Sequence, residues 1–324
     1  MLQRDTITDP TGATAKKLVV CCLPIALISV IMTFANMIDM LTVNPCIKTA
    51  MKASSHTFDS LLSDKLTTDM LPNFIYGSYT GLAVTVFGLV PTITAMFGKS
   101  ILPSLAESCA KNDKKAMQSD LTKMLIVTSI IAIPAGMGIA FLSEPILRFL
   151  FGGRETEIQV CIMPMSILGI AVIFLAIATP CFSILQTLGK PHKAIIIMLA
   201  GGIIKLFLRQ PIINISGAAI STLVSEVFIC VLSVRSVCKM TDLKPKVSEI
   251  FVKPTYAAIM CSVTAALSHE TLTKIAHLQI NHRFVTLFSI GIGSTMYFFC
   301  LYLLCETPKN IVNYIFSKKN PQNP

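Results

Sequence analysis

Long apolar runs free of charge alternate with short polar segments along most of the chain, from Leu18 to Leu304. A transmembrane helix needs about 20 consecutive apolar residues, and roughly eight runs approach that length. The pattern predicts an all-α polytopic membrane bundle of about eight transmembrane helices. The predicted spans are 18–43, 71–103, 121–142, 158–188, 194–208, 215–237, 251–267 and 284–304.

Two shorter amphipathic segments are predicted to be helices on the membrane surface. In the connection 44–70, apolar residues recur at helical spacing between polar ones. The second segment is 143–153. There Ser143 is expected to cap the helix, Pro145 to occupy the first turn and Gly152 to end it.

The composition excludes most soluble classes of protein. Of the 324 residues, 53% are hydrophobic and 14% are charged, and the mean hydropathy is +0.70. Soluble domains carry about 25% charged residues. The 11 cysteines lie mostly inside apolar runs and form no CxxC pair, so we interpret them as small buried hydrophobes. We expect neither a disulfide framework nor a metal site.

The charge distribution predicts the topology. The net charge is +10, and the basic residues lie between the apolar runs rather than on an aromatic-studded face, so no nucleic-acid partner is expected. Of 27 Lys and Arg residues, 18 fall in the terminal segments and the even-numbered connections. Because basic residues concentrate on the cytoplasmic side, both termini are predicted to be cytoplasmic.

No catalytic motif is visible in the chain. GxSxG, Walker, HExxH and GxGxxG sequences are absent, as are paired carboxylates within the apolar runs. We therefore expect a protein that moves a solute or lipid, rather than an enzyme, and no cofactor.

Two charges fall near the middle of successive apolar runs. Lys205 lies about 16 Å along its predicted helix, and Glu226 lies at similar depth in the next, antiparallel one. Ionisable groups deep in lipid usually face a cavity or a partner. We interpret the two as an ion pair that lines or borders a substrate path, with a purely structural lock as the alternative.

Three further polar residues are candidates for the substrate or ion path. Asn36 and Asp39 lie one turn apart near the outer end of the first span, where helix-end polar residues are the alternative interpretation. Lys99 lies low in the second span. It is expected either to extend to the cytoplasmic surface or to attract a pyrophosphate into a central cavity.

Prolines inside the spans predict bent helices. Each removes a backbone donor, and transmembrane helices tolerate this where neighbours satisfy the freed carbonyl. Packing kinks explain any single one, but their number favours a transporter that bends or gates. The five candidates for kinks or gating are Pro24, Pro91, Pro134, Pro164 and Pro180.

Several short stretches, in this order, resemble the stage V sporulation protein B branch of the multidrug/oligosaccharidyl-lipid/polysaccharide flippase superfamily. The match covers about 18–239, and the last two spans fit by count only. The stretches are YGSYTG at 76–81, VFGLVPT at 86–92, SILPSLAE at 100–107, IPAG at 133–136, SEPIL at 143–147 with LFG at 150–152, ILQTLGKP at 184–191, GIIK at 202–205 and INISGAAIST at 213–222.

The resemblance implies two six-helix lobes plus two extra helices that work by alternating access, exporting lipid-linked oligosaccharide or cell-wall precursors across a bacterial plasma membrane. The chain would then hold a cytoplasmic segment (1–17), the second lobe (18–239), the two added helices (240–305) and a cytoplasmic tail (306–324). By this resemblance, the chain would lack the first lobe. Gly88 stands where the family often has asparagine. A short segment after Lys205 leaves the fifth span at about 15–17 residues, at the lower limit for crossing a bilayer.

Three functions follow from these observations. The leading one is half of a flippase. A cation-coupled multidrug antiporter of the same superfamily would need Glu226 or Asp39 to bind its ion. A non-transporting remnant or assembly scaffold would explain the missing lobe. Because one lobe cannot enclose a cavity between lobes, the expected partners are a separate N-terminal half or a second copy, besides membrane lipid and the lipid-linked sugar substrate.

Overall fold

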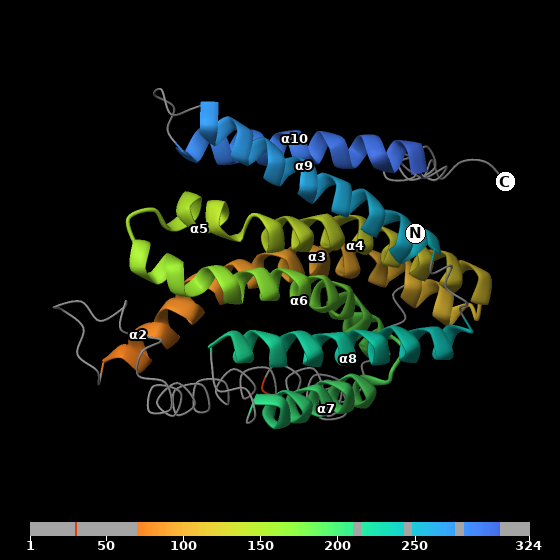
Figure 1. The fold of residues 1–324 in the computed structure, drawn as a ribbon. Helices are drawn as coiled ribbons and strands as arrows, with labels where there is room; N and C mark the ends of the chain where they lie inside the picture. The colour runs from red at the N-terminus through yellow and green to blue at the C-terminus, as the bar shows by residue number, and fades with distance from the viewer. Residues whose placement is uncertain (1–29, 31–69, 210–214, 243–247, 276–281, 305–324) are drawn as a thin grey trace, which may run out of the picture.

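The computed structural model describes residues 30, 70–209, 215–242, 248–275 and 282–304. Every element in these ranges is helical (Figure 1). The predicted first span and the surface segment after it lie outside the described residues, except for Val30 and Met70. Pro24, Asn36 and Asp39 lie outside them as well.

Seven helices in the described ranges are long and apolar enough to cross a membrane. They coincide with the last seven predicted spans, so the helical membrane bundle is confirmed for this part of the chain. The elements are α2 (Leu71–Ser78), η2 (Tyr79–Ala83), α3 (Val84–Ala110), α4 (Lys114–Phe141), α5 (Ser143–Phe151), α6 (Glu155–Thr187), α7 (Pro191–Arg209), α8 (Ile215–Thr241), η3 (Ser248–Val252), α9 (Lys253–Ile275) and α10 (His282–Leu304).

The expectation of a shortened fifth span was wrong. Helix α7 has 19 residues, which at 1.5 Å per residue gives about 28 Å. It begins at Pro191, before the predicted start at Ala194, because proline is well suited to the first position of a helix. By its length and composition, this helix is therefore able to cross a membrane.

Helix α6 forms the centre of the bundle. It packs against α3, α4 and α8, and it buries apolar side chains such as Leu168 and Val172 completely or nearly so. Helices α9 and α10 pair with each other and join the bundle through α4. Figure 1 shows them on the opposite side of the molecule from α7 and α8.

Close approach of the helices depends on glycine. A Cβ added at Gly136 of α4 would lie 2.6 Å from the carbonyl oxygen of Gly169 on α6, and one at Gly201 of α7 would lie 2.4 Å from Ile229 on α8. Small residues let transmembrane helices approach closely where hydrophobic driving force is weak. Gly201 thus lies in a helix contact, whereas Gly202 beside it has open space.

The predicted surface helix at 143–153 is present as α5. It ends at Gly152, and Pro145 lies in its first turn, both as expected. The predicted cap was wrong: Leu142 is the N-cap and makes no side-chain hydrogen bond, while Ser143 is the first helical residue and is buried. Leu147 is fully buried, which attaches α5 to the bundle.

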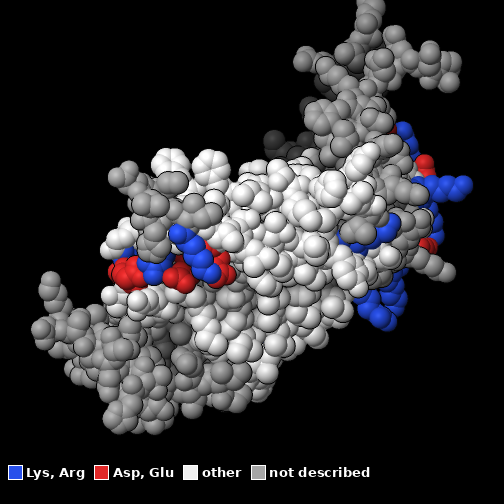
Figure 2. Space-filling model, turned by 45° about the horizontal axis from the view of Figure 1, so that its top comes forward, with Lys and Arg blue, Asp and Glu red and all other residues white. Residues whose placement is uncertain are grey.

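On the face shown in Figure 2, charged side chains gather at the two ends of the bundle, and the surface between them is uncharged. The end formed by the α3–α4, α6–α7 and α8–α9 connections is strongly basic, and we call it the basic end. The other end carries α5 and both acidic and basic residues, and we call it the α5 end. The basic end holds Lys111, Lys114, Lys115, Lys123, Lys190, Lys193, Arg235, Lys239 and Lys253.

Candidate functional site

One face of α3 and the π-helical turn before it is lined by small, hydroxyl and basic residues. We define the α3 face as Gly81, Thr85, Gly88, Thr92 and Lys99. These residues are 4, 7, 11 and 18 positions from the first, which places them on one side of a helix with 3.6 residues per turn. All five are exposed, so the other described helices leave this side of α3 uncovered.

The α3 face has few protruding side chains, and its threonine hydroxyls are hydrogen-bonded within the helix. A Cβ added at Gly81 or Gly88 would meet no other atom within 4 Å. The hydroxyls of Thr85 and Thr92 donate to the carbonyl oxygens of Gly81 and Gly88 at 2.8 Å, so they are satisfied within their own helix. The face can therefore border an aqueous or a mixed polar path, and both hydroxyl donors are already satisfied.

The π-helical turn Tyr79–Ala83 interrupts the long rod formed by α2 and α3. It carries one extra residue per turn, and such insertions are frequent at functional sites. Buried Tyr79 and Leu82 fix the turn against the bundle, while the Thr80 hydroxyl donates to the Tyr76 carbonyl at 2.9 Å. Sequence reasoning missed this turn; its only signal is the glycine and threonine content of 77–81.

The exposed Lys99 lies next to a close contact between α3 and α6 at Gly98. A Cβ at Gly98 would lie 2.6 Å from Pro180 Cβ, so α3 and α6 touch there and the exposed Lys99 follows immediately. Lys99 lies 11 residues before the end of α3, about 16 Å along the helix from the basic end. Its attraction for a pyrophosphate stays a prediction.

Helices α7 and α8 carry the two predicted mid-membrane charges and pack against each other. The Ser225 hydroxyl of α8 donates to the Gly201 carbonyl of α7 at 2.8 Å, which fixes their register. Glu226 directly follows Ser225, and Lys205 lies one turn beyond Gly201. Both charged side chains are half-buried, and their ion pair stays a prediction.

The four predicted prolines in the described ranges lie inside continuous helices: Pro91 in α3, Pro134 in α4, and Pro164 and Pro180 in α6. Pro91, Pro164 and Pro180 are buried, and Pro134 is half-buried. Their roles as gating hinges stay predictions.

Pro134 has a specific partner on another helix. A proline cannot donate to the carbonyl four residues earlier, which here belongs to Ile130. The hydroxyl of buried Tyr297 on α10 donates to that carbonyl at 2.8 Å. The freed acceptor thus becomes an attachment point between α4 and α10.

The part of the chain that the structure describes contains no group of three or more His, Cys, Asp or Glu residues able to hold a metal ion. The polar features with a clear arrangement are the α3 face and the charges on α7 and α8. Together with the bundle, these features define a polytopic membrane protein of the transporter type.

Residues 65–286 match the family model described as the lipid II flippase MurJ, and the chain belongs to this family. The match includes α9 and the start of α10, farther than the motifs of the sequence alone reached.

Two curated relatives are flippases by name. The chain is 21% identical over 223 residues to the lipid II flippase MurJ of Bacillus subtilis (strain 168), which covers 66% of this chain and 40% of the relative. It is 24% identical over 236 residues to the probable flippase AglR of Haloferax volcanii, covering 72% and 47% respectively. The chain spans less than half the length of both relatives.

Two solved structures share the fold. One is a lipid II flippase MurJ in an inward closed conformation, with a TM-score of 0.54 and 15% identity, covering 72% of this chain and 46% of that one. The other is a MOP superfamily transporter from Pyrococcus furiosus, with the same TM-score and identity, covering 93% and 69%. These likenesses show the architecture of the bundle.

Proposed function

We propose that the chain is part of a flippase that moves a lipid-linked oligosaccharide or cell-wall precursor across the membrane by alternating access. The observation that carries the proposal is the family match over residues 65–286. The α3 face supports it, because a low, exposed stripe of glycine and threonine ending at a lysine suits the wall of a polar path. By the resemblance to this superfamily, the proposed driving force is an ion gradient or the membrane potential.

In this function the α3 face contacts the headgroup of the substrate. Lys99 attracts its phosphate groups, since charge-assisted hydrogen bonds to phosphate are among the strongest in proteins. The glycines leave room for sugars, and the exposed apolar neighbours Leu89, Ile93 and Met96 border the lipid part. The headgroup therefore slides along α3 while the chain of the lipid remains in hydrocarbon.

The transport unit needs a second lobe. The chain spans less than half of its curated relatives, so we propose that it works with a separate six-helix half or with a second copy of itself. By the distribution of positive charge, the basic end faces the cytoplasm of a bacterial cell and the α5 end faces outward. Substrate then enters from the basic end, and Lys99 is the first residue of the α3 face that it reaches.

The test is flipping of a labelled lipid-linked oligosaccharide in liposomes that contain the chain with and without a complementary half. We expect flipping when both halves are present. Lys99→Gln should reduce the rate about tenfold, because a hydrogen bond to a charged group contributes about 1.5–3 kcal/mol.

Lys115→Gln is the matched control, since Lys115 is exposed at the basic end but lies off the α3 face. Equal rates for the two variants would contradict the role of Lys99. Absence of flipping in every combination would contradict the flippase proposal and favour a scaffold.

A cation-coupled antiporter is the second candidate, and the half-buried position of Glu226 in the middle of α8 favours it. A carboxylate at this depth is suited to binding a coupling ion. Proton- or sodium-dependent efflux of a cationic dye, abolished by Glu226→Gln, would support this function over the flippase.

A further inference from the structure

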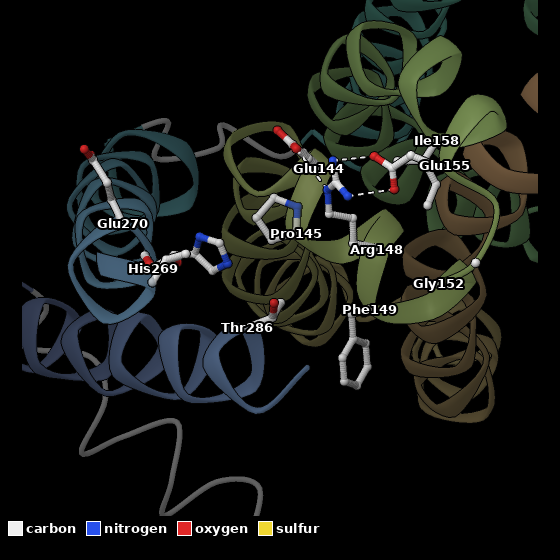
Figure 3. Close-up of a pocket in the computed structure, with 12 residues that line it drawn as sticks. Glu144, Pro145, Arg148, Phe149, Gly152, Glu155, Ile158, His269, Glu270 and Thr286 are labelled. Atoms are coloured by element: carbon white, nitrogen blue, oxygen red, sulfur yellow. Dashed lines mark hydrogen bonds and ion pairs between the residues drawn. The ribbon is translucent and has the colours of Figure 1, made fainter. Parts of the chain in front are cut away.

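Two cavities lie beside the paired helices α9 and α10. The larger, of about 580 Å³, lies at the α5 end, where Figure 3 shows Arg148 beside Glu144 and Glu155. Arg148 forms ion pairs with these two carboxylates at 3.0 and 2.6 Å, and all three side chains are about half-exposed. The charges of the larger cavity therefore already have partners, whereas the smaller cavity contains a polar group that has none.

The smaller cavity lies between α4 and the α9–α10 pair and has a volume of about 440 Å³. We call it the Ser262 cavity. Its size falls within the roughly 300–1,000 Å³ that is usual for small-molecule sites. The described residues that line it include no charged side chain, and their side-chain oxygens are the hydroxyls of Ser262, Ser294 and Tyr297. Because an unpaired charge is costly to bury, an occupant of this cavity has to be uncharged.

The three hydroxyls of the Ser262 cavity differ in their hydrogen bonds. Ser294 donates to the Ile290 carbonyl at 2.8 Å, and Tyr297 donates to the Ile130 carbonyl at 2.8 Å. Ser262 is fully buried, and its Oγ has no hydrogen-bond partner within the described ranges. Two other buried hydroxyls there, on α4, also lack a partner, but their residues do not line the cavity. The cavity therefore contains one hydroxyl donor that is still unmet.

Ser262 departs from the pattern of its own helix. Every other serine or threonine of α9 donates to the backbone carbonyl four residues earlier, namely Thr255, Thr264, Ser268, Thr271 and Thr273. A buried hydroxyl without a partner costs free energy, and a ligand oxygen that accepts from it removes that cost. Ser262 lies near the middle of the candidate span Ile250–Lys274, so a ligand would reach it from the lipid.

We propose that the Ser262 cavity binds an uncharged, membrane-dissolved molecule whose hydroxyl or carbonyl oxygen accepts a hydrogen bond from Ser262. The apolar remainder of this molecule contacts the aliphatic lining, such as Ile131 and Ala265. A plain hydrocarbon chain would leave the Ser262 donor unmet. The bound molecule lies between α4 and the α9–α10 pair, which the Tyr297 hydrogen bond to Ile130 also connects. Its binding does not depend on which substrate the protein transports.

Photolabelling with two matched probes tests the chemistry of the occupant. One probe is octanol that carries a diazirine, and the other is octane that carries the same diazirine but no hydroxyl. Each is photoactivated with the whole chain in lipid nanodiscs, and labelled peptides are identified by mass spectrometry. We expect the alcohol to label the lining residues of α4, α9 and α10 several-fold more than the hydrocarbon does, and we expect 2-octanone, which can only accept, to compete with it. Equal labelling by the two probes would indicate a hydrocarbon-chain site and overturn the proposal, as would no labelling of the lining.

The role of Ser262 is tested against a second buried serine. Ser262→Ala should reduce labelling by the alcohol about fivefold, the effect of one hydrogen bond, and leave labelling by the hydrocarbon unchanged. Ser289→Ala is the matched control, because Ser289 of α10 is also fully buried but donates to the Val285 carbonyl at 2.8 Å and does not line the cavity. Without the probe, Ser289→Ala should lower the Tm and Ser262→Ala should not. Unchanged alcohol labelling in Ser262→Ala, or an equal loss of Tm in both variants, would overturn the proposal.

The location of the site is tested by filling the cavity. Gly138 lines it, and a Cβ added at Gly138 meets no atom within 4 Å, so Gly138→Leu should occupy the cavity without disturbing helix packing. Gly202→Leu on α7 is the matched control, since its Cβ position is equally open but lies outside the cavity. We expect several-fold weaker labelling by the alcohol in Gly138→Leu alone, with circular dichroism showing that both variants are folded. Equal labelling of the two folded variants would contradict the proposed site.

Discussion

At the scale of single residues, Tyr297 and Pro134 explain how a transmembrane helix keeps an interior proline. Pro134 leaves the Ile130 carbonyl without its helical donor, and Tyr297 supplies that donor from α10 at 2.8 Å. The missing backbone donor in α4 and the attachment of α10 therefore meet in one interaction. It connects the last described helix to the bundle through a backbone acceptor that only a proline could free.

Tyr297→Phe is expected to destabilise the protein by about 1 kcal/mol, within the range measured for hydrogen bonds between transmembrane helices. Pro134→Ala restores a backbone N–H to the Ile130 carbonyl, so in that background Tyr297→Phe should cost much less. The measurement is a double-mutant cycle of unfolding free energies in detergent. Additive effects of the two substitutions would contradict the shared acceptor.

The sequence identifies Pro134 but not Tyr297 as part of this arrangement. Proline inside an apolar run is a local signal, and it correctly predicted a donor gap in the helix. The partner is 163 positions further on, and which of several tyrosines reaches the gap depends on how α9 and α10 dock on α4. Lys205 and Glu226 are similar, because the sequence shows their depth whereas the register of α7 on α8 is set by Ser225 and Gly201.

At the scale of elements, α3 shows two glycines with opposite surroundings. Gly98 faces α6, where an added Cβ would lie 2.6 Å from Pro180 Cβ and 3.0 Å from its Cα. Gly88 faces open space on the α3 face. One glycine therefore serves helix contact and the other keeps the exposed face low, although the sequence alone does not distinguish them.

Gly98→Leu should destabilise the bundle by about 1–3 kcal/mol, the usual cost of overpacking, because α3 must move away from α6. Gly88→Leu should leave the Tm nearly unchanged but slow transport by blocking the face. Thermal unfolding in detergent and the liposome assay measure the two effects. A large loss of stability in Gly88→Leu would contradict the open surroundings of that residue.

The C-terminus of α8 is attached to the start of α4 at the basic end. Gln118 donates through Nε2 to the carbonyl oxygens of Thr241 and Asp242, both at 3.1 Å, and Lys114 Nζ lies 2.8 Å from Asp242 Oδ2. Asp242 has a φ of 52°, the left-handed conformation that commonly ends a helix. This contact fixes the C-terminal end of α8 against α4.

The ion pair of Asp242 with Lys114 should stabilise the folded protein slightly, and this effect should depend on pH. A hydrogen bond and the charge of Lys114 lower the pKa of Asp242 below its usual 3.8. Because the pKa is lowered in the folded state, the contribution is complete above pH 3.8 and is lost as the pH falls through the lowered value. Asp242→Asn should remove this part of the acid dependence of Tm, measured between pH 6 and about 3.

Both groups of the pair are exposed, with Lys114 and Asp242 side chains 72% and 67% accessible, so the effect should be small and weakened by salt. Asp113→Asn is a poor control because Asp113 caps α4 through Lys115 and Ala116. Asp120→Asn is better, since Asp120 accepts from Ser104 on the neighbouring helix α3 and does not touch α8. An unchanged acid profile in Asp242→Asn would contradict the attachment.

At the scale of the whole molecule, the apolar belt and the two charged ends could be predicted well from the sequence. Uncharged runs of about 20 residues report helix positions directly, and seven of the eight predicted spans coincide with described helices. The shape of the candidate site could not be predicted, because the π-helical turn and the exposure of the α3 face depend on which sides of α3 are covered by α4 and α6. The two cavities beside α9 and α10 likewise arise only from packing.

We propose that the α3 face borders a polar path for a headgroup, while the opposite side of α3 is buried. The most direct measurement is a scan of single cysteines along α3 in a cysteine-free background, labelled in membranes with a hydrophilic maleimide. Cysteines at Gly81, Thr85, Gly88 and Thr92 should be labelled and then protected by lipid-linked oligosaccharide, whereas those at buried Val86 and Val90 should not react. Equal labelling of both sides, or no protection of the α3 face by the substrate, would contradict the account.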